Sequence, residues 1–489
     1  MRKKLSSALA ASVVLAAGCK ESPISPPVDN PTVDAIQGAL TRSGLQTLAT
    51  GLVNADRAII TGIPYVVLPG ILQRDIYRID SSEPRYVTET LGGNADIGSF
   101  AAGAGLWNSA YVTTRAATSL IAAIPTAAAD QVSAAEKSAA LGFAKTIKAL
   151  ATYRVVETRD SVGVVIQGAD PNKVDPLVCK TLGINYVAAL LDSALTDLNA
   201  AGASTKVPFA LPTGFTAAGA GATDYSTVAN LIRLNRGLKG KVDVYRGLLR
   251  PAPVAGAEAA AITELTTFLG GAGPGQVQKA QFTLGAYHTF VAGGTENTPN
   301  PFADARIVLN PHVAQTATTV GAFGGVLATD TRASKWSTRS TALTGSGISS
   351  TVNLNVAATT TANQTRPLAI LRYEEAVLLR AQAYFETGDF ANGLLDLNSV
   401  HTAYGNPALT SAQINNIAAA RQAIIYEKRY SLLGEGPQIL VDLRAYGLLK
   451  AGSAPAELTG DPFNTTFPLP KAEQDARGIT GTTPTLTCS

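Results

Sequence analysis

The chain has 489 residues, with 39 Lys and Arg against 36 Asp and Glu, and 15% of its residues are charged. Three basic residues lie in the first four positions, so residues 19–489 carry 36 basic and 36 acidic side chains and are neutral. No basic run elsewhere could follow a row of phosphates, so nucleic-acid binding is not expected. The low charge and the abundant Ala and Gly favour packed helices with uncharged polar loops over disorder.

The N-terminus predicts export and a lipid anchor. A basic start at residues 1–4 precedes an apolar run of 13 residues at 5–17, shorter than the roughly 20 residues of a membrane-spanning helix. The end of this run, Leu15-Ala16-Ala17-Gly18-Cys19, resembles a lipobox, in which the cysteine is acylated and becomes the new N-terminus. Residues 1–18 are therefore expected to be a lipoprotein signal peptide and Cys19 the lipidation site. Ordinary secretion is the alternative, because Ala16 stands where Leu is preferred. No later segment is expected to span a membrane.

Residues 19–33 are predicted to form a proline-rich tether. Four prolines fall within twelve positions, and such a stretch stays extended. A disordered N-terminus is the simpler alternative and predicts the same behaviour.

Apolar residues at helical spacing predict a scaffold of helices in the first half of the chain. The expected helices cover about 34–60, 107–124, 133–157, 183–200, 227–249 and 255–269. Residues 61–105 are interrupted by Pro64, Pro69 and Pro84 and by many glycines. This segment is therefore predicted to be a loop-rich surface segment.

The middle of the chain, residues 270–366, is rich in Gly, Thr, Ser and Asn, and residues 340–365 contain no charged side chain. Residues 352–356 alternate apolar and polar, which predicts a short strand or hairpin within long loops.

Helical order returns at Leu371, and residues 376–397 look like one tetratricopeptide-type helical hairpin. Small Ala381 and Ala383 let two helices approach, Gly388-Asp389 makes the turn, and Phe390 packs back. There is no clean 34-residue period, so divergent repeats are expected to supply the other helix pairs.

Several segments of the C-terminal third carry a family resemblance. In order, they are residues 371–379, 397–400, 425–432, 435–436, 442–444 and 467–470. They resemble the SusD/RagB family of outer-membrane nutrient-binding lipoproteins. Trp107 with Tyr111 is similar to the N-terminal half of that family. Gln438 and Ala445 depart from it, because both stand where the family commonly has Arg.

The resemblance implies a mainly α fold: a tetratricopeptide-like helical hairpin scaffold with long irregular loops and minor β hairpins. Residues 34–489 would form one SusD-like domain, with its scaffold at about 34–60, 107–269 and 371–450. Loops at about 61–105 and 270–366 would lie on the ligand side.

The resemblance also implies a role without catalysis or a cofactor. The protein would be anchored in the outer membrane, facing the cell exterior, and would cap a TonB-dependent (SusC-like) transporter. It would capture a polymeric nutrient, an oligosaccharide or a peptide, and deliver it to that transporter. A periplasm-facing tetratricopeptide scaffold and a lipid-anchored glycan hydrolase are the alternatives.

Catalytic and metal-binding patterns are weak in this sequence. No P-loop, zinc-protease or nucleophile-elbow motif occurs, and His288, His312 and His401 are expected to be scattered surface residues rather than metal ligands. Glycoside hydrolysis needs two acids that flank one bond, but adjacent helical residues such as Glu374 and Glu375 point about 100° apart. This pair is therefore expected to be solvated or ion-paired.

A dense polar set within the resembling segments is interpreted as a network that fixes the C-terminal helix to the loops, with a ligand site as the alternative. Its members are Glu427, Arg429, Glu435, Asp442 and Arg444.

Sugar binding calls for flat aromatic side chains in loops. The candidates are Tyr65, Tyr77, Tyr86 and Trp336, and burial in the core is the alternative for each. Outside the cytoplasm, Cys179 and Cys488 could form one disulfide or stay as thiols.

Overall fold

The structure is a computed structural model that describes most of the chain after residue 39. The described ranges are 40–61, 64–92, 96–168, 170, 173–216, 223–250, 252–294, 297–319, 330–453, 457–458, 460–479 and 486. The predicted signal peptide, Cys19, the tether and Cys488 lie outside the described residues. Helices account for 55% of the structure, so the mainly α expectation is confirmed.

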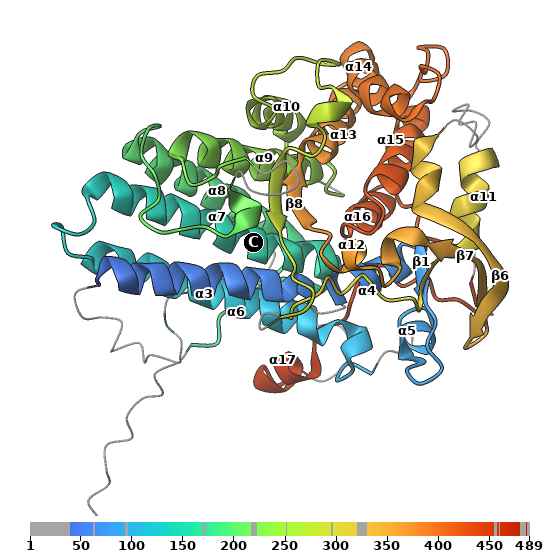
Figure 1. Ribbon diagram of the computed structural model, residues 1–489, viewed down its shortest axis with the longest axis horizontal. Helices are drawn as coiled ribbons and strands as arrows, with labels where there is room; N and C mark the ends of the chain where they lie inside the picture. Colours follow the sequence, from blue (N-terminus) through green and yellow to red (C-terminus); the bar gives the residue numbers. More distant parts are fainter. Residues whose placement is uncertain are drawn as a thin grey trace, which may run out of the picture.

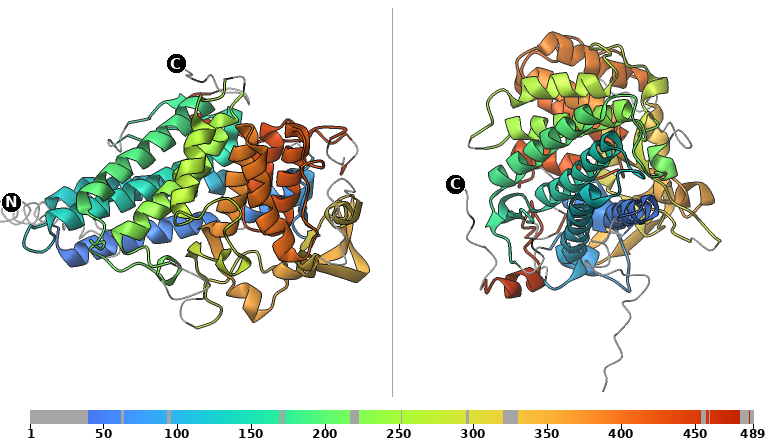
Figure 2. Two further views of the ribbon diagram at one scale, coloured as in Figure 1. Left: turned by 90° about the horizontal axis from the view of Figure 1, so that it is seen from above. Right: turned by 90° about the vertical axis from the view of Figure 1, so that its left-hand side faces the viewer.

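Helices that follow one another in the chain pack side by side, and together they form the scaffold (Figures 1 and 2). The first series runs α3 (Arg42–Thr61), α6 (Ala104–Ala123), α7 (Ala134–Arg159), α8 (Lys180–Ala201), α9 (Val228–Gly247) and α10 (Ala257–Phe268). It continues with α13 (Tyr373–Glu386), α14 (Phe390–His401), α15 (Ile417–Ser431) and α16 (Gln438–Ala445). The predicted helices between 107 and 269 are confirmed, with ends that shift by a few residues. The first prediction, about 34–60, is confirmed from Arg42 onward, and residues 34–39 lie outside the described residues.

Local capping explains where several of these helices begin. Ser133 precedes α7 and forms a capping box with Glu136: the Glu136 amide donates to Ser133 Oγ at 3.3 Å, and the Ser133 amide donates to Glu136 Oε2 at 2.9 Å. The turn before α14 uses Gly388 at φ 85°, followed by Asp389, which accepts a hydrogen bond from the Asn392 amide at 3.2 Å. The predicted hairpin of residues 376–397 is confirmed.

Three small antiparallel sheets complete the fold. The four-stranded sheet has the order β1 (Ile76–Arg78), β5 (Ile307–Leu309), β7 (Ile348–Leu354) and β6 (Trp336–Gly345). The two-stranded sheets pair β2 (Val164–Val165) with β3 (Leu177–Val178), and β4 (Gly285–His288) with β8 (Leu368–Arg372). The predicted hairpin near residues 352–356 is confirmed as β6–β7, in which Trp336 lies opposite Leu354.

The remaining elements are short. They are η2 (Ile124–Thr126), η3 (Asp160–Val162), η4 (Thr213–Phe215), η5 (Lys279–Gln281), α11 (Pro311–Thr319), η6 (Thr331–Lys335), η7 (Asn355–Ala357), α12 (Thr361–Gln364), η8 (Thr402–Tyr404) and α17 (Lys471–Ala476). Half of them lie within the loops of residues 270–366.

The prediction that residues 61–105 form a loop-rich surface segment is wrong. The segment contains α4 (Pro64–Leu72), β1, α5 (Arg85–Thr88) and η1 (Phe100–Ala102), and residues 65–79 are buried throughout. Pro64 opens α4, at a position where a helix tolerates proline, and Pro69 lies inside it. The apolar residues between the prolines bury the segment, which the proline count alone did not predict.

Among the described residues, one helical stretch, Arg42–Leu72, is long and apolar enough to cross a membrane, but 73% of its most apolar window is buried inside the protein. This stretch therefore belongs to the core.

Candidate functional site

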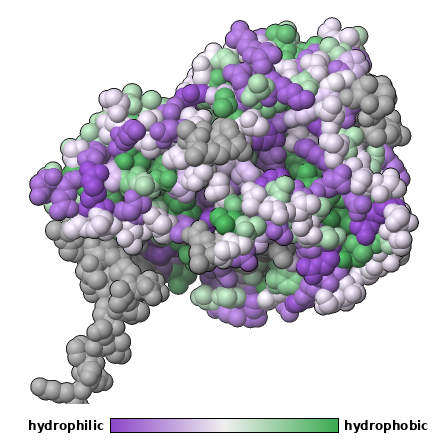
Figure 3. Space-filling model, viewed as in Figure 1, coloured by the Kyte–Doolittle hydropathy of each residue, from purple (hydrophilic) through white to green (hydrophobic). Residues whose placement is uncertain are grey.

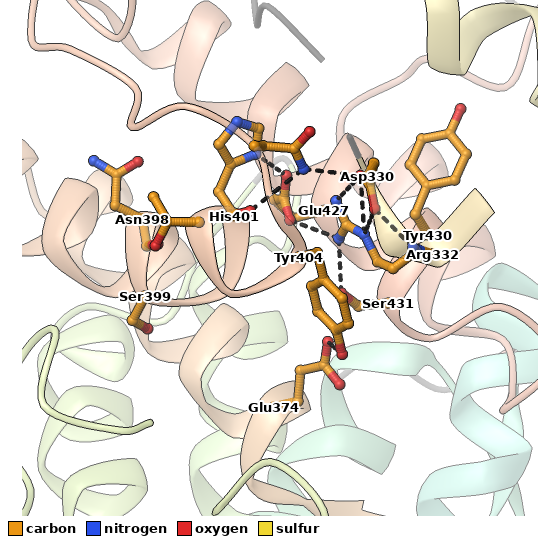
Figure 4. A network of polar contacts seen from close by, with 12 residues as sticks. Asp330, Arg332, Glu374, Asn398, Ser399, His401, Tyr404, Glu427, Tyr430 and Ser431 are labelled. Atoms are coloured by element: carbon orange, nitrogen blue, oxygen red, sulfur yellow. Dashed lines mark hydrogen bonds and ion pairs between the residues drawn. The ribbon is translucent and has the colours of Figure 1, made fainter. Parts of the chain in front are cut away.

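A fully buried cation, Arg332, joins the loop before β6 to α15 (Figure 4). Its Nη2 lies 2.7 Å from Asp330 Oδ2, and its Nη1 donates to Glu427 Oε2 at 2.7 Å and to Ser431 Oγ at 2.9 Å. Burial alone would raise the pKa of Asp330, but the hydrogen bonds and the charge of Arg332 outweigh it and lower that pKa. Both partners of this pair are therefore ionised at neutral pH.

The carboxylates of this network are shared with α14 and its following turn. Glu427 Oε1 is bonded to His401 Nδ1 at 2.6 Å, and Asn406 Nδ2 donates to Asp330 Oδ2 at 2.8 Å. The guanidinium of Arg332 also stacks over the ring of Tyr404, 4.7 Å from its centroid. The network thus fixes three separate segments to one another.

A second buried arginine, Arg372, continues this network to the start of α13. It pairs with Glu374 and makes two hydrogen bonds to Glu435, at 2.8 and 2.9 Å. The Tyr404 hydroxyl donates to Glu374 at 2.8 Å (Figure 4). Burial lowers the pKa of the neighbouring Lys335 to about 8, and its ammonium donates to backbone carbonyls of α15.

The five polar residues of the resembling segments form structural ion pairs, as the sequence predicted. Glu427 and Glu435 pair with Arg332 and Arg372 as described above. The other three pairs are Arg429–Asp75 at 2.8 Å, Asp442–Lys428 at 2.9 Å and Arg444–Asp160 at 3.2 Å. Most of these partners lie on other elements, so the set fixes the C-terminal helices to the rest of the fold.

The adjacent acids Glu374 and Glu375 are ion-paired and buried, not solvated. Each residue is 1% exposed, and Glu375 lies 3.1 Å from Lys241 Nζ. The prediction of surface histidines is wrong for two of the three. His288 and His401 are buried, and each is bonded to a carboxylate, Asp56 in the first case and Glu427 in the second.

The three tyrosines predicted to bind a ligand lie in the core. Tyr65, Tyr77 and Tyr86 are 7%, 3% and 5% exposed. The Tyr65 hydroxyl donates to Glu157 at 3.1 Å, that of Tyr77 is bonded to Glu457, and the ring of Tyr86 lies under the guanidinium of Arg78. The surface position on which their prediction was based is therefore wrong. All three pack in the core with a polar or cationic partner, and for Tyr65 and Tyr77 that partner lies far along the chain.

Trp336, the fourth predicted aromatic residue, is half-buried at the start of β6. Its ring lies 5.8 Å from that of Tyr430 on α15. Tyr77 and Trp336 are on β1 and β6, the two outer strands of the same sheet, so the structure does not bring them together. Of the four, Trp336 alone keeps a partly accessible ring.

The structure describes only one cysteine of the predicted pair. Cys179 is buried at the N-terminus of α8, directly after β3, and Cys488 lies outside the described residues. Their pairing stays a prediction.

An open cleft of about 640 Å³ lies where α3 meets the loops of the middle segment, and we call it the α3 cleft. It is lined by Asn54, Arg57, Ala58, Thr61, Thr298, Pro299, Asn300, Pro301, Ala303, Asp304, Arg306, Thr359 and Gln364. Asn54, Arg57 and Thr61 are three and four positions apart, so they form one stripe on the helix, with Ala58 beside it. Its other walls come from residues 298–306 and from the region of α12.

Ion pairs hold the loop wall of the α3 cleft in place. Asp304 accepts hydrogen bonds from Arg306 Nε at 2.8 Å and from Arg78 Nε at 3.0 Å, and Arg306 also bonds Asp80 at 2.8 Å. Asn300 donates to the Arg366 carbonyl at 2.7 Å and accepts from the Phe302 amide at 2.9 Å. The wall is thus rigid enough to present its remaining polar groups to a ligand.

Polar side chains supply much of the lining of the α3 cleft. Its lining offers amide, hydroxyl and guanidinium groups, and none of the described residues that line it is aromatic. This cleft was not predicted from the sequence, because its described lining has neither an aromatic residue nor a pair of carboxylates. The spacing of Asn54, Arg57 and Thr61 on a predicted helix was the available signal.

A second hollow, of about 560 Å³, lies between α6, α17 and the loop that follows β2. Trp107 and Tyr111 form its floor, and Val112 and Val174 at its edge are each 61% exposed. The Tyr111 hydroxyl accepts from the Val165 amide and donates to the Val165 carbonyl, so it is fully used by the fold. This hollow presents mainly apolar surface. On the face of the molecule that Figure 3 shows, hydrophilic and hydrophobic side chains are interspersed.

Comparison with known sequences gives a match to one family. The family model described as the SusD family matches residues 289–476, a range that contains the Arg332 network and the signature segments. Residues 289–476 therefore match the SusD family, and the chain as a whole has the SusD-like fold. Proteins of that family are non-catalytic binding proteins associated with the cell envelope.

Solved structures share the fold of this chain. A SusD superfamily protein from Bacteroides thetaiotaomicron is 16% identical with a TM-score of 0.65, over 91% of this chain and 100% of that one. A SusD-like protein from Bacteroides fragilis is 13% identical with a TM-score of 0.62, over 93% and 99%. A SusD-like carbohydrate binding protein from Bacteroides vulgatus is 13% identical with a TM-score of 0.58, over 83% of each chain. No curated protein matches the chain.

Proposed function

We propose that this chain is an outer-membrane lipoprotein that captures a polymeric nutrient, a glycan, and passes it to a TonB-dependent transporter. The match of residues 289–476 to the SusD family carries the proposal. One structure with the same fold is named a SusD-like carbohydrate binding protein, which supports a sugar as the ligand class. The amide and hydroxyl groups of the α3 cleft are of the kind that hydrogen-bond sugar hydroxyls.

A binding screen tests the ligand class and the site together. Polysaccharides and peptides are titrated into the purified protein, and the best ligand is then tested on an Asn54→Ala, Gln364→Ala double variant. Loss of two hydrogen-bonding side chains is expected to lower the affinity about tenfold. Asn108→Ala in the second hollow is the matched control and is expected to leave the affinity unchanged.

The screen also decides between the α3 cleft and the sequence-based candidate Trp336. If Trp336→Ala lowers the affinity while the double variant does not, the ligand binds beside β6 rather than at α3. Failure of every polysaccharide to bind would argue against the proposed function itself.

The transporter partner is tested by co-purification from detergent-solubilised outer membrane. A TonB-dependent β-barrel transporter is expected to accompany the protein, and its absence would count against the proposal. Protease treatment of intact cells separates this role from a periplasm-facing scaffold: a capturing protein at the cell surface is cleaved, whereas a scaffold is protected.

A further inference from the structure

The α3 cleft contains an arginine that points away from its neighbour in the chain. Asp56 and Arg57 are adjacent on α3, and adjacent helical residues point about 100° apart. Asp56 is fully buried, pairs with Arg154 and is bonded to His288 Nε2 at 2.8 Å. Arg57 instead lines the cleft and is partly exposed. Arg154 and His288 therefore compensate the buried charge of Asp56, and Arg57 is not involved.

Arg57 differs from the other arginines around the cleft because it has no anionic partner among the described residues. Arg306 is bonded to Asp304 and Asp80, and Arg78 lies 3.0 Å from Asp304 and 3.2 Å from Asp80. Arg57 makes no hydrogen bond or ion pair with any residue that the structure describes. The described lining holds two arginines against one aspartate, so the cleft carries one positive charge that none of the described carboxylates compensates.

The groups beside Arg57 can bind neutral hydroxyls. Asn54 lies one turn earlier on the same face of α3, and Gln364 lines the opposite wall. Thr298 Oγ1 is buried and has no hydrogen-bond partner within the described part of the chain. With no aromatic ring in the described lining, the cleft cannot select a sugar by stacking, so charge and hydrogen bonds determine what it takes.

We propose that the α3 cleft binds a glycan that carries acidic groups, carboxylate or sulfate, and that Arg57 pairs with one of them. The guanidinium presents two parallel N–H donors that match either anion, while Asn54, Gln364 and Thr298 bind hydroxyls of the adjoining sugars. This assignment rests on the proposed function and specifies the class of glycan.

The test compares polymers that differ only in charge. The full-length protein in detergent is titrated with polygalacturonate and with the same polymer after reduction of its carboxylates to alcohols. Carrageenan and its desulfated form make up the sulfate arm. Tighter binding of at least one acidic polymer than of its uncharged form is expected, with an affinity that falls as salt increases, because the ion pair is screened over about 10 Å at 0.1 M salt.

Two arginine variants locate the charge. Arg57→Gln is expected to weaken binding of the preferred acidic polymer about tenfold or more and to leave binding of the uncharged form unchanged, and Arg57→Lys to restore part of the loss. Arg115→Ala, in the second hollow, is the matched control and is expected to have no effect. Since Arg57 is partly exposed and unpaired in the described structure, its substitution should leave the midpoint of urea unfolding unchanged.

Three results would overturn the assignment. An uncharged glycan whose binding needs Asn54 and Gln364 but not Arg57 would leave the proposed function standing and remove the acidic ligand. Loss of acidic-polymer binding in Arg115→Ala but not in Arg57→Gln would move the site to the second hollow. Binding of no polysaccharide at all would overturn the proposed function and this assignment together.

Discussion

Buried arginine side chains hold the C-terminal half of the chain together residue by residue. Arg332, Arg372 and Arg380 are each buried and paired with at least one carboxylate. Replacing such a pair by apolar residues can be neutral, but removing one partner leaves an uncompensated charge in the interior. Their contribution is therefore best measured by deleting a single partner.

Arg332→Ala should be strongly destabilising. The change leaves Asp330 and Glu427 buried without their cation, so we expect the free energy of unfolding to fall by about 3–5 kcal/mol in urea titrations. Arg85→Ala removes an exposed arginine paired with Glu83 and serves as the control, with a much smaller change expected because solvent screens this pair. Equal effects of the two substitutions would mean that the Arg332 network does not stabilise the fold.

Acid should destabilise the protein partly through His288. Burial lowers the pKa of this histidine in the folded protein, and its bond to Asp56 offsets burial only in part. The unfolded chain binds a proton near pH 6.5, while the folded protein resists it until a lower pH. The free energy of unfolding should therefore fall as the pH drops below about 6.5, by at most about 1.4 kcal/mol per pH unit.

His288→Gln removes this titration. Urea unfolding at pH 7.5, 6.5 and 5.5 should show a shallower loss of stability for the variant than for the wild type, although the variant starts lower. Parallel curves for the two proteins would show that His288 does not contribute to the acid sensitivity.

Individual contacts were the hardest feature to predict from the sequence. Tyr65 and Tyr77 read as loop aromatics because their partners, Glu157 and Glu457, lie 92 and 380 positions away. Arg57 was missed for the opposite reason: its significance lies in the lack of a partner among the described residues. Neither property can be read from local spacing.

At the scale of elements, hydrophobic periodicity predicted the helices whose positions are set by local sequence. The helices α6 to α10 and the α13–α14 hairpin were placed within a few residues, because their apolar spacing and turn residues are local signals. Residues 61–105 were misread because proline and glycine were counted as loop signals. Pro64 instead begins a buried helix, since the missing amide proton costs nothing in a first turn.

Close packing of α9 against α10 should depend on Gly237. A Cβ added at this position would lie 2.6 Å from the Phe268 ring and 2.8 Å from Leu371. Gly237→Ala gains up to about 1 kcal/mol of helix propensity, but overpacking costs about 1–3 kcal/mol, so a net loss of stability is expected.

Gly51→Ala on α3 is the matched control for this prediction. No described atom lies within 4 Å of the added methyl group, so helix propensity acts alone and should raise the free energy of unfolding by about 0.5–1 kcal/mol. Chemical denaturation of both variants should give opposite signs. A stabilised Gly237→Ala variant would show that α9 and α10 can separate to accept a methyl group.

The end of the chain passes β3 closely enough to support a disulfide between Cys179 and Cys488. A Cβ on Gly163 would lie 2.7 Å from Leu486 Cδ2 and 2.9 Å from the Val178 carbonyl, so Leu486 packs beside the residue before Cys179. Two residues of chain span at most about 7 Å, and a disulfide joins Cα atoms roughly 4.4–6.8 Å apart.

Mass spectrometry of the exported protein checks this bond. Without reductant, we expect a peptide that joins Cys179 to Cys488 and resists alkylation, and after reduction both thiols should react. Alkylation of both cysteines in the unreduced protein would show that no bond forms, with Cys488→Ser as the reference for an unpaired Cys179.

At the scale of the whole molecule, the family resemblance predicted the overall fold, which hydrophobic periodicity alone could not predict. Local signals predicted helices and a hairpin, but the order in which α3 to α15 pack and the four-stranded sheet depend on contacts across the chain. Residues 19–39, which precede the described part, could extend at most about 70 Å. An anchor on Cys19 would therefore leave the domain close to the membrane.

Lipid attachment at Cys19 can be measured directly. Cells grown with labelled fatty acid should incorporate the label into the protein, and Cys19→Ser should abolish both labelling and sedimentation with the membrane. Cys179→Ser is the control and should remain labelled. An unlabelled wild-type protein would favour ordinary secretion over the lipid anchor.

The pairing of the N-terminal part with the far end of the chain has a consequence for biogenesis. Arg74 pairs with Asp461, 387 positions later, and Gln73 Oε1 accepts from the Leu440 amide, 367 positions later. Asp75 likewise needs Arg429. Until translocation delivers those residues, α4 and β1 lack the partners that neutralise their buried polar groups. We expect the emerging polypeptide to stay unfolded and dependent on chaperones for most of its translocation across the membrane. It should fold only once about its last fifty residues have been translocated, because contacts of high sequence separation need both of their partners.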